Sequence, residues 1–264
     1  MAMYADLVRY RDLFVSLFRR ELRSKYKGSL LGLAWTLVNP VVLMLVYTVV
    51  FSVLWRAVAI KHYPLFILSG LLVWIFFQSS LQSSSVSLLG HANLVKQVKF
   101  PRQLLPLAVV GTNLVTFLVM LVIIASVNLV ALPRTRDTVW AVVPLALPLV
   151  AVVSGLAIIV ACATVLFRDV EHLITAILLP WFFLTPIFYE LYKLPGVDRH
   201  ANLARLIEYG NFLTPVLNAI REPLFFGQLP SAGDVVYAVV AGIVALGLGA
   251  FVFGRIDDQL AVQL

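Results

Sequence analysis

The ionisable side chains that could do acid–base or metal chemistry are few and scattered along the chain. A membrane enzyme would need such groups near the membrane boundary, and the candidate acids there are Asp169, Glu171, Asp257 and Asp258. The four histidines show no metal-ligand spacing, so we predict no metal site. Cys162 is alone within an apolar run, and we expect a small buried core residue there. The sequence thus gives little support for catalysis.

The composition is that of an integral membrane protein. Hydrophobic residues make up 61% and charged residues 12% of the 264 residues, and the mean hydropathy is +0.97. Soluble domains are typically about 45 to 50% apolar and about 25% charged. A helix needs about 20 apolar residues to cross the hydrocarbon core. Six windows without Lys, Arg, Asp or Glu therefore predict six transmembrane helices, of which the fifth is the shortest: residues 28–55, 63–90, 103–133, 138–167, 173–189 and 235–254.

These windows lack the period-two alternation of membrane barrel strands, so the predicted fold is an all-α integral membrane protein. The formal net charge of +7 lies outside them, where it can orient the chain and contact anionic lipid headgroups. Nucleic acid is a poor explanation for this charge. In the sixth window, Gly242, Gly247 and Gly249 favour close approach of a neighbouring helix.

Residues 1–27 are both basic and periodic. Their apolar residues recur at steps of three or four and share one helical face: Leu7, Tyr10, Phe14, Leu17, Phe18, Leu22 and Tyr26. This pattern predicts an amphipathic interfacial helix on the membrane surface, with its apolar face sunk into the lipid interface and its arginines at the headgroups, and not a cleavable signal peptide. Between the first two windows, the only Lys or Arg residues are Arg56 and Lys61. Because basic segments favour the cytoplasm, the more basic residues 1–27 place the N-terminus there, and six crossings return the C-terminus to the same side.

Two sets of side chains within the first two windows allow alternative interpretations. Tyr47, Phe51 and Trp55 are four residues apart and form one aromatic stripe, which suits either an interfacial belt or a path through the membrane. Gln78 and Gln82 share a face with small hydroxyl residues, which suits either helix contacts or a hydrated passage.

The fifth window and the segment after it are unusual. Trp181, Phe188 and Tyr189 lie on a predicted helix that Pro180 and Pro186 should break. Residues 190–234 are too long and too apolar for a plain loop. Within them, residues 211–230 predict a short re-entrant helix, whose Arg221 and Glu222 need water or partners.

Residues 91–106, HANLVKQVKFPRQLLP, are the compact basic segment between two long apolar windows. Three basic side chains surround Val98 and Phe100. Because Pro101 disfavours helical geometry at Phe100, we predict a short helix that ends near Lys99 and a turn into the third span. An ordinary basic cytoplasmic loop is the plain alternative.

The pattern LVKQVKFPRQLLPL, with KGSLLGLAWTLVNP before it, resembles the permease subunits of ABC exporters of bacterial cell-surface polysaccharides, the group that exports O-antigen, capsule and teichoic acid. FRDVEHLI at residues 167–174 and LTPIFY at residues 184–189 are similar to this family as well. The resemblance covers residues 19–255. The family commonly has Asn-Pro where this chain has Asn211-Phe212.

The resemblance implies a six-span permease in the bacterial cytoplasmic membrane that pairs with a second copy of itself. Two separate nucleotide-binding subunits would hold ATP and Mg, and the substrate would be a lipid-linked polysaccharide. The chain has no GxxxxGK[ST] phosphate loop, so we expect no cofactor of its own. The implied coupling loop spans residues 91–103, with contacts to the ATPase at Leu94, Val95, Lys96, Gln97, Val98, Lys99, Phe100, Pro101 and Arg102, braced by Arg168 and Asp169.

In such an exporter, aromatic faces can stack on sugar rings and let a polymer slide. The implied translocation path is lined by Tyr47, Phe51, Gln78, Gln82, Trp181, Phe188 and Tyr189. The family also has two short helices on the outer face, with an arginine matching Arg221. Arg221 and Glu222 are therefore the implied outer gate, within residues 190–234 of a permease domain that spans residues 28–264.

Three alternatives remain open. The first is an ABC permease for a small molecule or a drug. The second is a membrane enzyme that acts on a lipid-linked sugar, for which the acids named above are few. The third, a passive channel, is disfavoured because the six windows hold no Asp, Glu, Lys or Arg.

Overall fold

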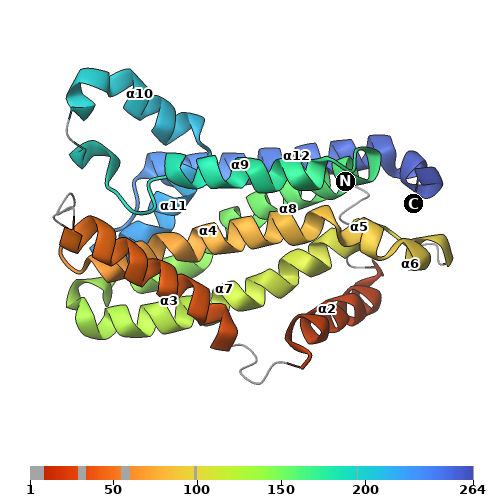
Figure 1. The fold of residues 1–264 in the computed structure, drawn as a ribbon, viewed down its shortest axis with the longest axis horizontal. Helices are drawn as coiled ribbons and strands as arrows, with labels where there is room; N and C mark the ends of the chain where they lie inside the picture. Colours follow the sequence, from red (N-terminus) through yellow and green to blue (C-terminus); the bar gives the residue numbers. More distant parts are fainter. Residues whose placement is uncertain (1–8, 29–33, 55–59, 98–99, 195, 264) are drawn as a thin grey trace.

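A computed structural model of the chain describes residues 9–28, 34–54, 60–97, 100–194 and 196–263, and it contains helices and no strands in these ranges. The long helices lie roughly side by side (Figure 1). Within the described residues, five helical segments are long and apolar enough to cross a membrane: Leu37–Leu54, Tyr63–Ser85, Leu104–Ala131, Val139–Leu166 and Ala232–Asp257. The all-α prediction is confirmed for these ranges.

The first half of the chain forms α2 (Arg11–Tyr26), α3 (Trp35–Tyr47), the π-helix η2 (Thr48–Leu54), α4 (Tyr63–Ser85), α5 (Ser87–Gly90), α6 (Ala92–Gln97), α7 (Leu104–Ala131) and η3 (Pro133–Thr135). The second half forms η4 (Val139–Ala141), α8 (Val142–Leu166), α9 (Val170–Leu184), η5 (Leu191–Lys193), η6 (Val197–His200), α10 (Ala201–Arg205), the π-helix η7 (Leu206–Gly210), α11 (Leu213–Arg221), the π-helix η8 (Glu222–Phe226) and α12 (Ala232–Gln263).

Helix α9 differs from the predicted fifth span. It begins three residues earlier, ends at Leu184 before Pro186, and contains Pro180 without being broken there. Membrane helices tolerate an internal proline because neighbouring groups satisfy the freed carbonyl. At about 1.5 Å per residue, its 15 residues extend about 22 Å, which is less than the roughly 30 Å hydrocarbon core. A sixth crossing therefore stays a prediction.

Helices α4 and α8 form the centre of the bundle. Of the membrane-capable window on each, 67% of the residues are buried, compared with 6% on the first segment, Leu37–Leu54. Phe66, Phe77 and Leu149 are among the large side chains with no measurable exposure. Burial of such side chains contributes about 1.5 to 3 kcal/mol each in water, but between helices in lipid the gain comes from close contact instead.

Helices α8 and α12 approach closely through glycine. A Cβ atom on Gly155 would overlap the backbone of Ala245, and one on Gly249 would lie 2.8 Å from the Gly155 carbonyl oxygen. One on Gly242 would lie 3.0 Å from the Ala151 Cβ. The predicted role is confirmed for Gly242 and Gly249. Gly247 has no such neighbour within 4 Å, because it lies on another face of α12.

Helix α2 has the predicted apolar face, but that face lies against the protein. Leu17 is 5% exposed, and Phe14 and Phe18 pack with it onto a cluster that includes Leu104 of α7, Ile158 of α8 and Phe253 of α12. The expectation that this face sinks into lipid is therefore wrong for these residues. Periodicity identifies an apolar face and not the surface that covers it.

Residues 190–234 fold into short helices at the end of the molecule opposite α5 and α6 (Figure 1). The predicted short helix is confirmed as α11, in which Leu213, Val216 and Ile220 have no measurable exposure. It packs against α4, α8 and α12. Its depth in a membrane stays a prediction.

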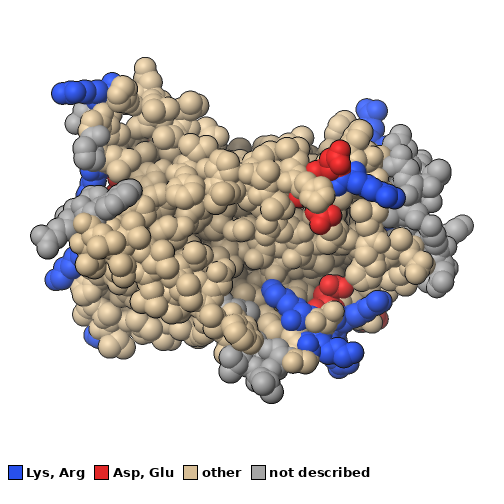
Figure 2. Space-filling model, in the orientation of Figure 1, with Lys and Arg blue, Asp and Glu red and all other residues tan. Residues whose placement is uncertain are grey.

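Charged side chains gather at the two ends of the molecule. On the face drawn in Figure 2, Lys, Arg, Asp and Glu lie near these ends, and an uncharged band separates them. An uncharged band of this kind is expected of a chain surrounded by a hydrocarbon core.

Candidate functional site

The basic segment of residues 91–103 lies at the end of the molecule where α12 ends (Figure 1). Helix α6 covers Ala92–Gln97, as the sequence predicts, and Pro101 opens the turn into α7, since its carbonyl oxygen accepts a hydrogen bond from the Leu104 N–H at 3.1 Å. Leu94 and Phe100 are half-buried and pack against the cluster beneath α2. Val98 and Lys99 lie outside the described residues.

Several other residues named in the sequence analysis, or their side chains, also lie outside the described part of the chain. Trp55 and Leu7 lie outside the described residues. The side chains of Val95, Lys96, Gln97 and Asp258 are likewise outside the described part of the chain. Their predicted roles stay predictions.

Two contacts between a basic and an acidic side chain flank this segment. At its start, the Nε2 atom of His91 lies 3.1 Å from the Oε1 atom of Glu21 on α2. At its end, the Nη1 atom of Arg102 donates to the Oδ1 atom of Asp257 on α12 at 3.0 Å. Sequence reasoning missed both partners, since no local pattern links positions 70 and 155 residues apart.

The turn between α8 and α9 lies at the same end of the molecule as α5 and α6 (Figure 1). Arg168 and Asp169 are both exposed there. Asp169 occupies the N-cap position of α9 without a capping hydrogen bond from its side chain, and Glu171 lies in the first turn. Two acids at a helix start interact favourably with the helix dipole.

Four of the five aromatic residues predicted to line a path, all except Trp181, meet in one cluster. Tyr47 and Phe51 stack on Phe188, with ring centroids 5.8 Å and 5.1 Å apart, and Tyr189 lies edge-on to Phe188. Phe182, a residue that sequence reasoning did not select, stacks on Tyr47. In one copy of the chain these rings cover one another, and Phe188 is only 9% exposed.

The remaining predicted path residues lie on neighbouring surfaces. Trp181 donates from its indole Nε1 to the Oδ1 atom of Asn211 at 2.9 Å. Gln78 accepts a hydrogen bond from the indole of Trp74 at 2.7 Å, and Gln82 is half-buried one helical turn further along α4. The structure therefore brings the aromatic residues of the first and fifth windows together, and it places the glutamines on α4.

At the opposite end, Arg221 is buried and holds the turn that follows α9. Its side chain is 3% exposed, and it donates to the carbonyl oxygens of Pro186 at 2.6 Å and Ile187 at 2.8 Å. Gly70 on α4 leaves room for it, since a Cβ there would overlap the Arg221 Nη2 atom. Arg221 thus joins α11, α4 and the end of α9.

A cavity of about 290 Å³ adjoins Arg221 and is also lined by Glu190, Glu222 and Asp234. Burial, aided by the nearby charge of Asp234, raises the pKa of Glu222 above its usual value. Glu190 pairs with Lys193 at 2.7 Å. The cavity is therefore acidic around one buried guanidinium group.

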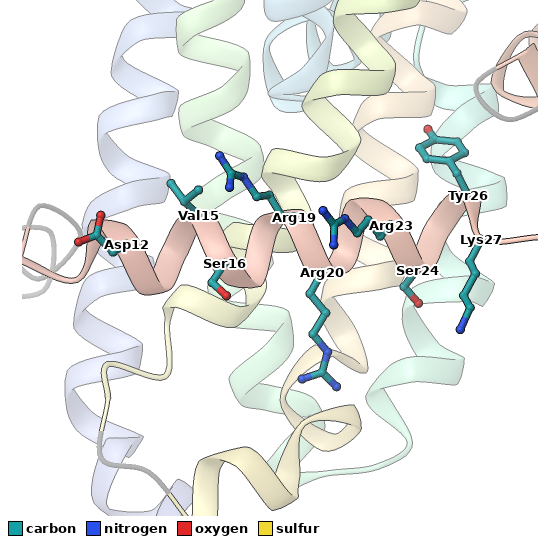
Figure 3. Close-up of a pocket in the computed structure, with 9 residues that line it drawn as sticks. All are labelled: Asp12, Val15, Ser16, Arg19, Arg20, Arg23, Ser24, Tyr26 and Lys27. Atoms are coloured by element: carbon teal, nitrogen blue, oxygen red, sulfur yellow. The ribbon is translucent and has the colours of Figure 1, made fainter.

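The outward face of α2 carries a wide, open groove of about 1260 Å³. In Figure 3, Arg19 and Arg23 project to one side of the helix, and Arg20 and Lys27 project to the other. Because the apolar face of α2 is covered by the protein, these cations are free to reach anionic groups outside the chain.

No group of three His, Cys, Asp or Glu side chains in the described part of the chain is placed to hold a metal ion. Cys162 is buried, as predicted. The arrangement offers contact surfaces and an aromatic cluster, and no evident reaction centre among the described residues.

The family model described as ABC-2 type transporter matches residues 12–225. The chain belongs to the ABC-2 type transporter family. The match begins in α2 and ends in η8, so it includes residues 91–103, the aromatic cluster and Arg221. As an ABC-2 type transporter with several membrane-capable helices, the chain is a multi-pass membrane protein and a membrane component of a transporter.

Relatives within this transporter group are similar over nearly the whole chain. The chain is 31% identical over 264 residues to the O-antigen export system permease protein RfbA of Myxococcus xanthus, with 98% of each chain covered. A protein of the same name from Klebsiella pneumoniae is 28% identical over 251 residues, which cover 95% of this chain and 94% of that protein. The resemblance seen in the motifs is thus confirmed.

Proposed function

We propose that this chain is the transmembrane subunit of an ATP-driven ABC exporter that moves a lipid-linked polysaccharide across the bacterial cytoplasmic membrane. The observation that carries this proposal is the similarity, over 98% of the chain, to a protein named as an O-antigen export permease. The chain supplies the membrane path. Both termini lie in the cytoplasm, on the side of the basic residues of α2.

The energy comes from ATP and Mg bound to two separate nucleotide-binding subunits. Residues 91–103 are the coupling loop that receives each ATPase. Their support is the basic composition and a position between two membrane-capable helices. Arg168 and Asp169, exposed at the same end, brace the contact.

A second copy of the chain completes the path. Helices α3 and α9 support this proposal because they are sparsely covered: only 6% of the Leu37–Leu54 window is buried, and α9 buries Leu178 and Phe182 alone among its described residues. Between two copies, the cluster around Tyr47, Phe188 and Tyr189 would open toward sugar rings. Aromatic faces suit this role because stacking needs no fixed hydrogen-bond geometry.

The short helices of residues 190–234 form the outer gate, with Arg221 as its internal strut and Glu222 at its acidic cavity. The outward cations of α2 contact anionic headgroups of the membrane. No nucleic acid is involved. These assignments follow the family resemblance and the arrangement of charge at the two ends of the molecule.

Co-purification tests the proposed coupling loop. The chain is expressed with the ATPase encoded beside it, and complex formation and cell-surface glycan are measured for wild type and Phe100→Ala. We expect the wild type to form the complex and export glycan, and Phe100→Ala to lose most export. Phe251→Ala is the matched control, because Phe251 is an exposed aromatic on α12. Absence of any complex, with export intact in Phe100→Ala, would contradict the proposal.

A further inference from the structure

We infer that Glu21 and Asp257 are positioning residues that hold the coupling loop against helices α2 and α12. The inference rests on the proposed function, since it concerns how the loop of residues 91–103 is held for the ATPase. His91 and Arg102 stand at the two ends of this loop, and each is paired with an acid on a different helix.

At the start of the loop, His91 is held on both ring nitrogens. Its Nδ1 atom lies 2.9 Å from the Ser87 carbonyl oxygen, and its Nε2 atom lies 3.1 Å from the Glu21 carboxylate. Both neighbours are hydrogen-bond acceptors, so the ring contacts one acceptor through each of its nitrogens. The two side chains are 14% and 25% exposed, which makes solvent screening weaker than for a surface pair.

At the end of the loop, Arg102 contacts Asp257 twice. Its Nη1 atom donates to the Asp257 carboxylate at 3.0 Å and also to the Asp257 main-chain carbonyl oxygen. The Arg102 side chain is 20% exposed. Charge-assisted hydrogen bonds of this kind are about twice as strong as neutral ones, so the last residues before α7 are tied to the end of α12.

Each acid belongs to a helix that is itself fixed to the bundle. Four residues beyond Glu21, the Lys25 Nζ atom donates to the Asn113 Oδ1 atom of α7 at 2.7 Å. Helix α12 packs closely against α8 at Gly155, where an added Cβ atom would overlap the backbone of Ala245. A displacement of α6 is therefore transmitted to the bundle through α2 at the start of the loop and through α12 at its end.

The contacts of His91 with Glu21 and of Arg102 with Asp257 also give the basic residues of the loop a role beyond the positive-inside bias of cytoplasmic loops. A basic residue that only obeyed the bias would need no acid of the same chain opposite it. Here the two basic side chains at the loop ends each contact an acid of this chain, whereas Lys96 lies between them within α6. His91 and Arg102 position the loop, and the residues between them are left for the partner.

Charge exchange tests the inference. The single variants Asp257→Arg and Arg102→Glu and the double variant that combines them are assembled with the ATPase, and glycan exported per ATP hydrolysed is measured. We expect each single variant to lower this ratio about tenfold, which corresponds to the loss of one charged hydrogen bond. The double variant should recover part of this loss, because the charged pair is restored with its charges exchanged whereas the hydrogen bond to the main-chain carbonyl oxygen is not. Asp137→Arg, at an exposed acid of the opposite end, is the control and should match wild type.

The start of the loop is tested in the same way with Glu21→His, His91→Glu and their double variant. A second readout needs no ATPase: amide hydrogen exchange at Ala92–Gln97 in the isolated chain should quicken in each single variant and slow again in each double variant. The inference would be overturned if the single variants exchanged their amide hydrogens at the wild-type rate. It would also be overturned if the double variants were no closer to wild type than the single variants in either readout. If the chain binds no ATPase but exchange responds as expected, the fastening stands and the proposed function fails.

Discussion

The guanidinium group of Arg221 lies over the ring of Phe66, with its Cζ atom 4.1 Å from the ring centroid. The same group donates to two carbonyl oxygens in the turn after α9. A cation buried against an aromatic face gains more than one in water. This single side chain thus connects the outer helices to the centre of the bundle.

Replacing Arg221 should therefore weaken the outer end of the molecule. Arg221→Gln removes the two charged hydrogen bonds and leaves two buried carbonyl oxygens without their partner, a loss of about 3 kcal/mol or more. We expect a clearly lower thermal midpoint for the purified chain in detergent. Arg199→Gln, at an exposed arginine of the same segment, should leave the midpoint unchanged. Equal midpoints for the two variants would show that Arg221 is not a strut.

Gly70 should be equally sensitive, for a steric reason. A Cβ atom on Gly70 would overlap the Arg221 Nη2 atom and lie 3.0 Å from the Ile187 carbonyl oxygen, so Gly70→Ala must displace the guanidinium group. Gly254→Ala meets no such neighbour within 4 Å and should stabilise α12 by about 0.5 to 1 kcal/mol. Thermal midpoints should thus move in opposite directions. A stabilising Gly70→Ala would contradict this geometry.

Glu222 predicts a pH dependence of stability. Burial raises the pKa of Glu222 above 4.5, the value expected in the unfolded chain. At pH values between the unfolded and the folded pKa, the folded chain therefore binds more protons than the unfolded chain. Stability from this group is present at low pH and falls as the pH rises through the raised pKa. Unfolding midpoints measured from pH 4.5 to 8 should decline less in Glu222→Gln than in wild type, with Glu171→Gln as an exposed control. Parallel curves for Glu222→Gln and wild type would count against a buried carboxylate.

The aromatic cluster predicts a defect in export that is separable from folding. Tyr47→Leu and Phe51→Leu keep apolar volume and remove stacking faces, each worth about 0.5 to 1.5 kcal/mol. We expect severalfold less glycan at the cell surface, with the amount of membrane-inserted chain unchanged. Leu in place of the exposed Phe251 should have no effect. Undiminished export in both cluster variants would remove these residues from the path.

Much of the fold was predictable because hydrophobicity alone decides what enters a membrane. The windows of residues 63–90, 103–133 and 138–167 each contain a confirmed long helix. The continuation of α9 through Pro180 was not predictable in the same way, since a proline ring would break such a helix in water.

The candidate site was predictable only where a local pattern exists. The turn at Pro101 and the short helix before it follow from the restriction on the residue before proline. The partners of His91 and Arg102 lie on α2 and α12, and only the tertiary structure brings them together. The packing of Phe14 and Phe18 against the bundle likewise depends on tertiary contacts that no local pattern shows.

Transport in proteoliposomes tests the central proposal most directly. The chain is reconstituted with its ATPase, and movement of a labelled lipid-linked polysaccharide across the bilayer is measured with and without ATP. We expect ATP to drive the movement, and omission of either subunit or use of a nonhydrolysable nucleotide to abolish it. Movement or cleavage of the labelled lipid by this chain alone, without ATPase or ATP, would contradict a role as the membrane subunit of an ATP-driven exporter.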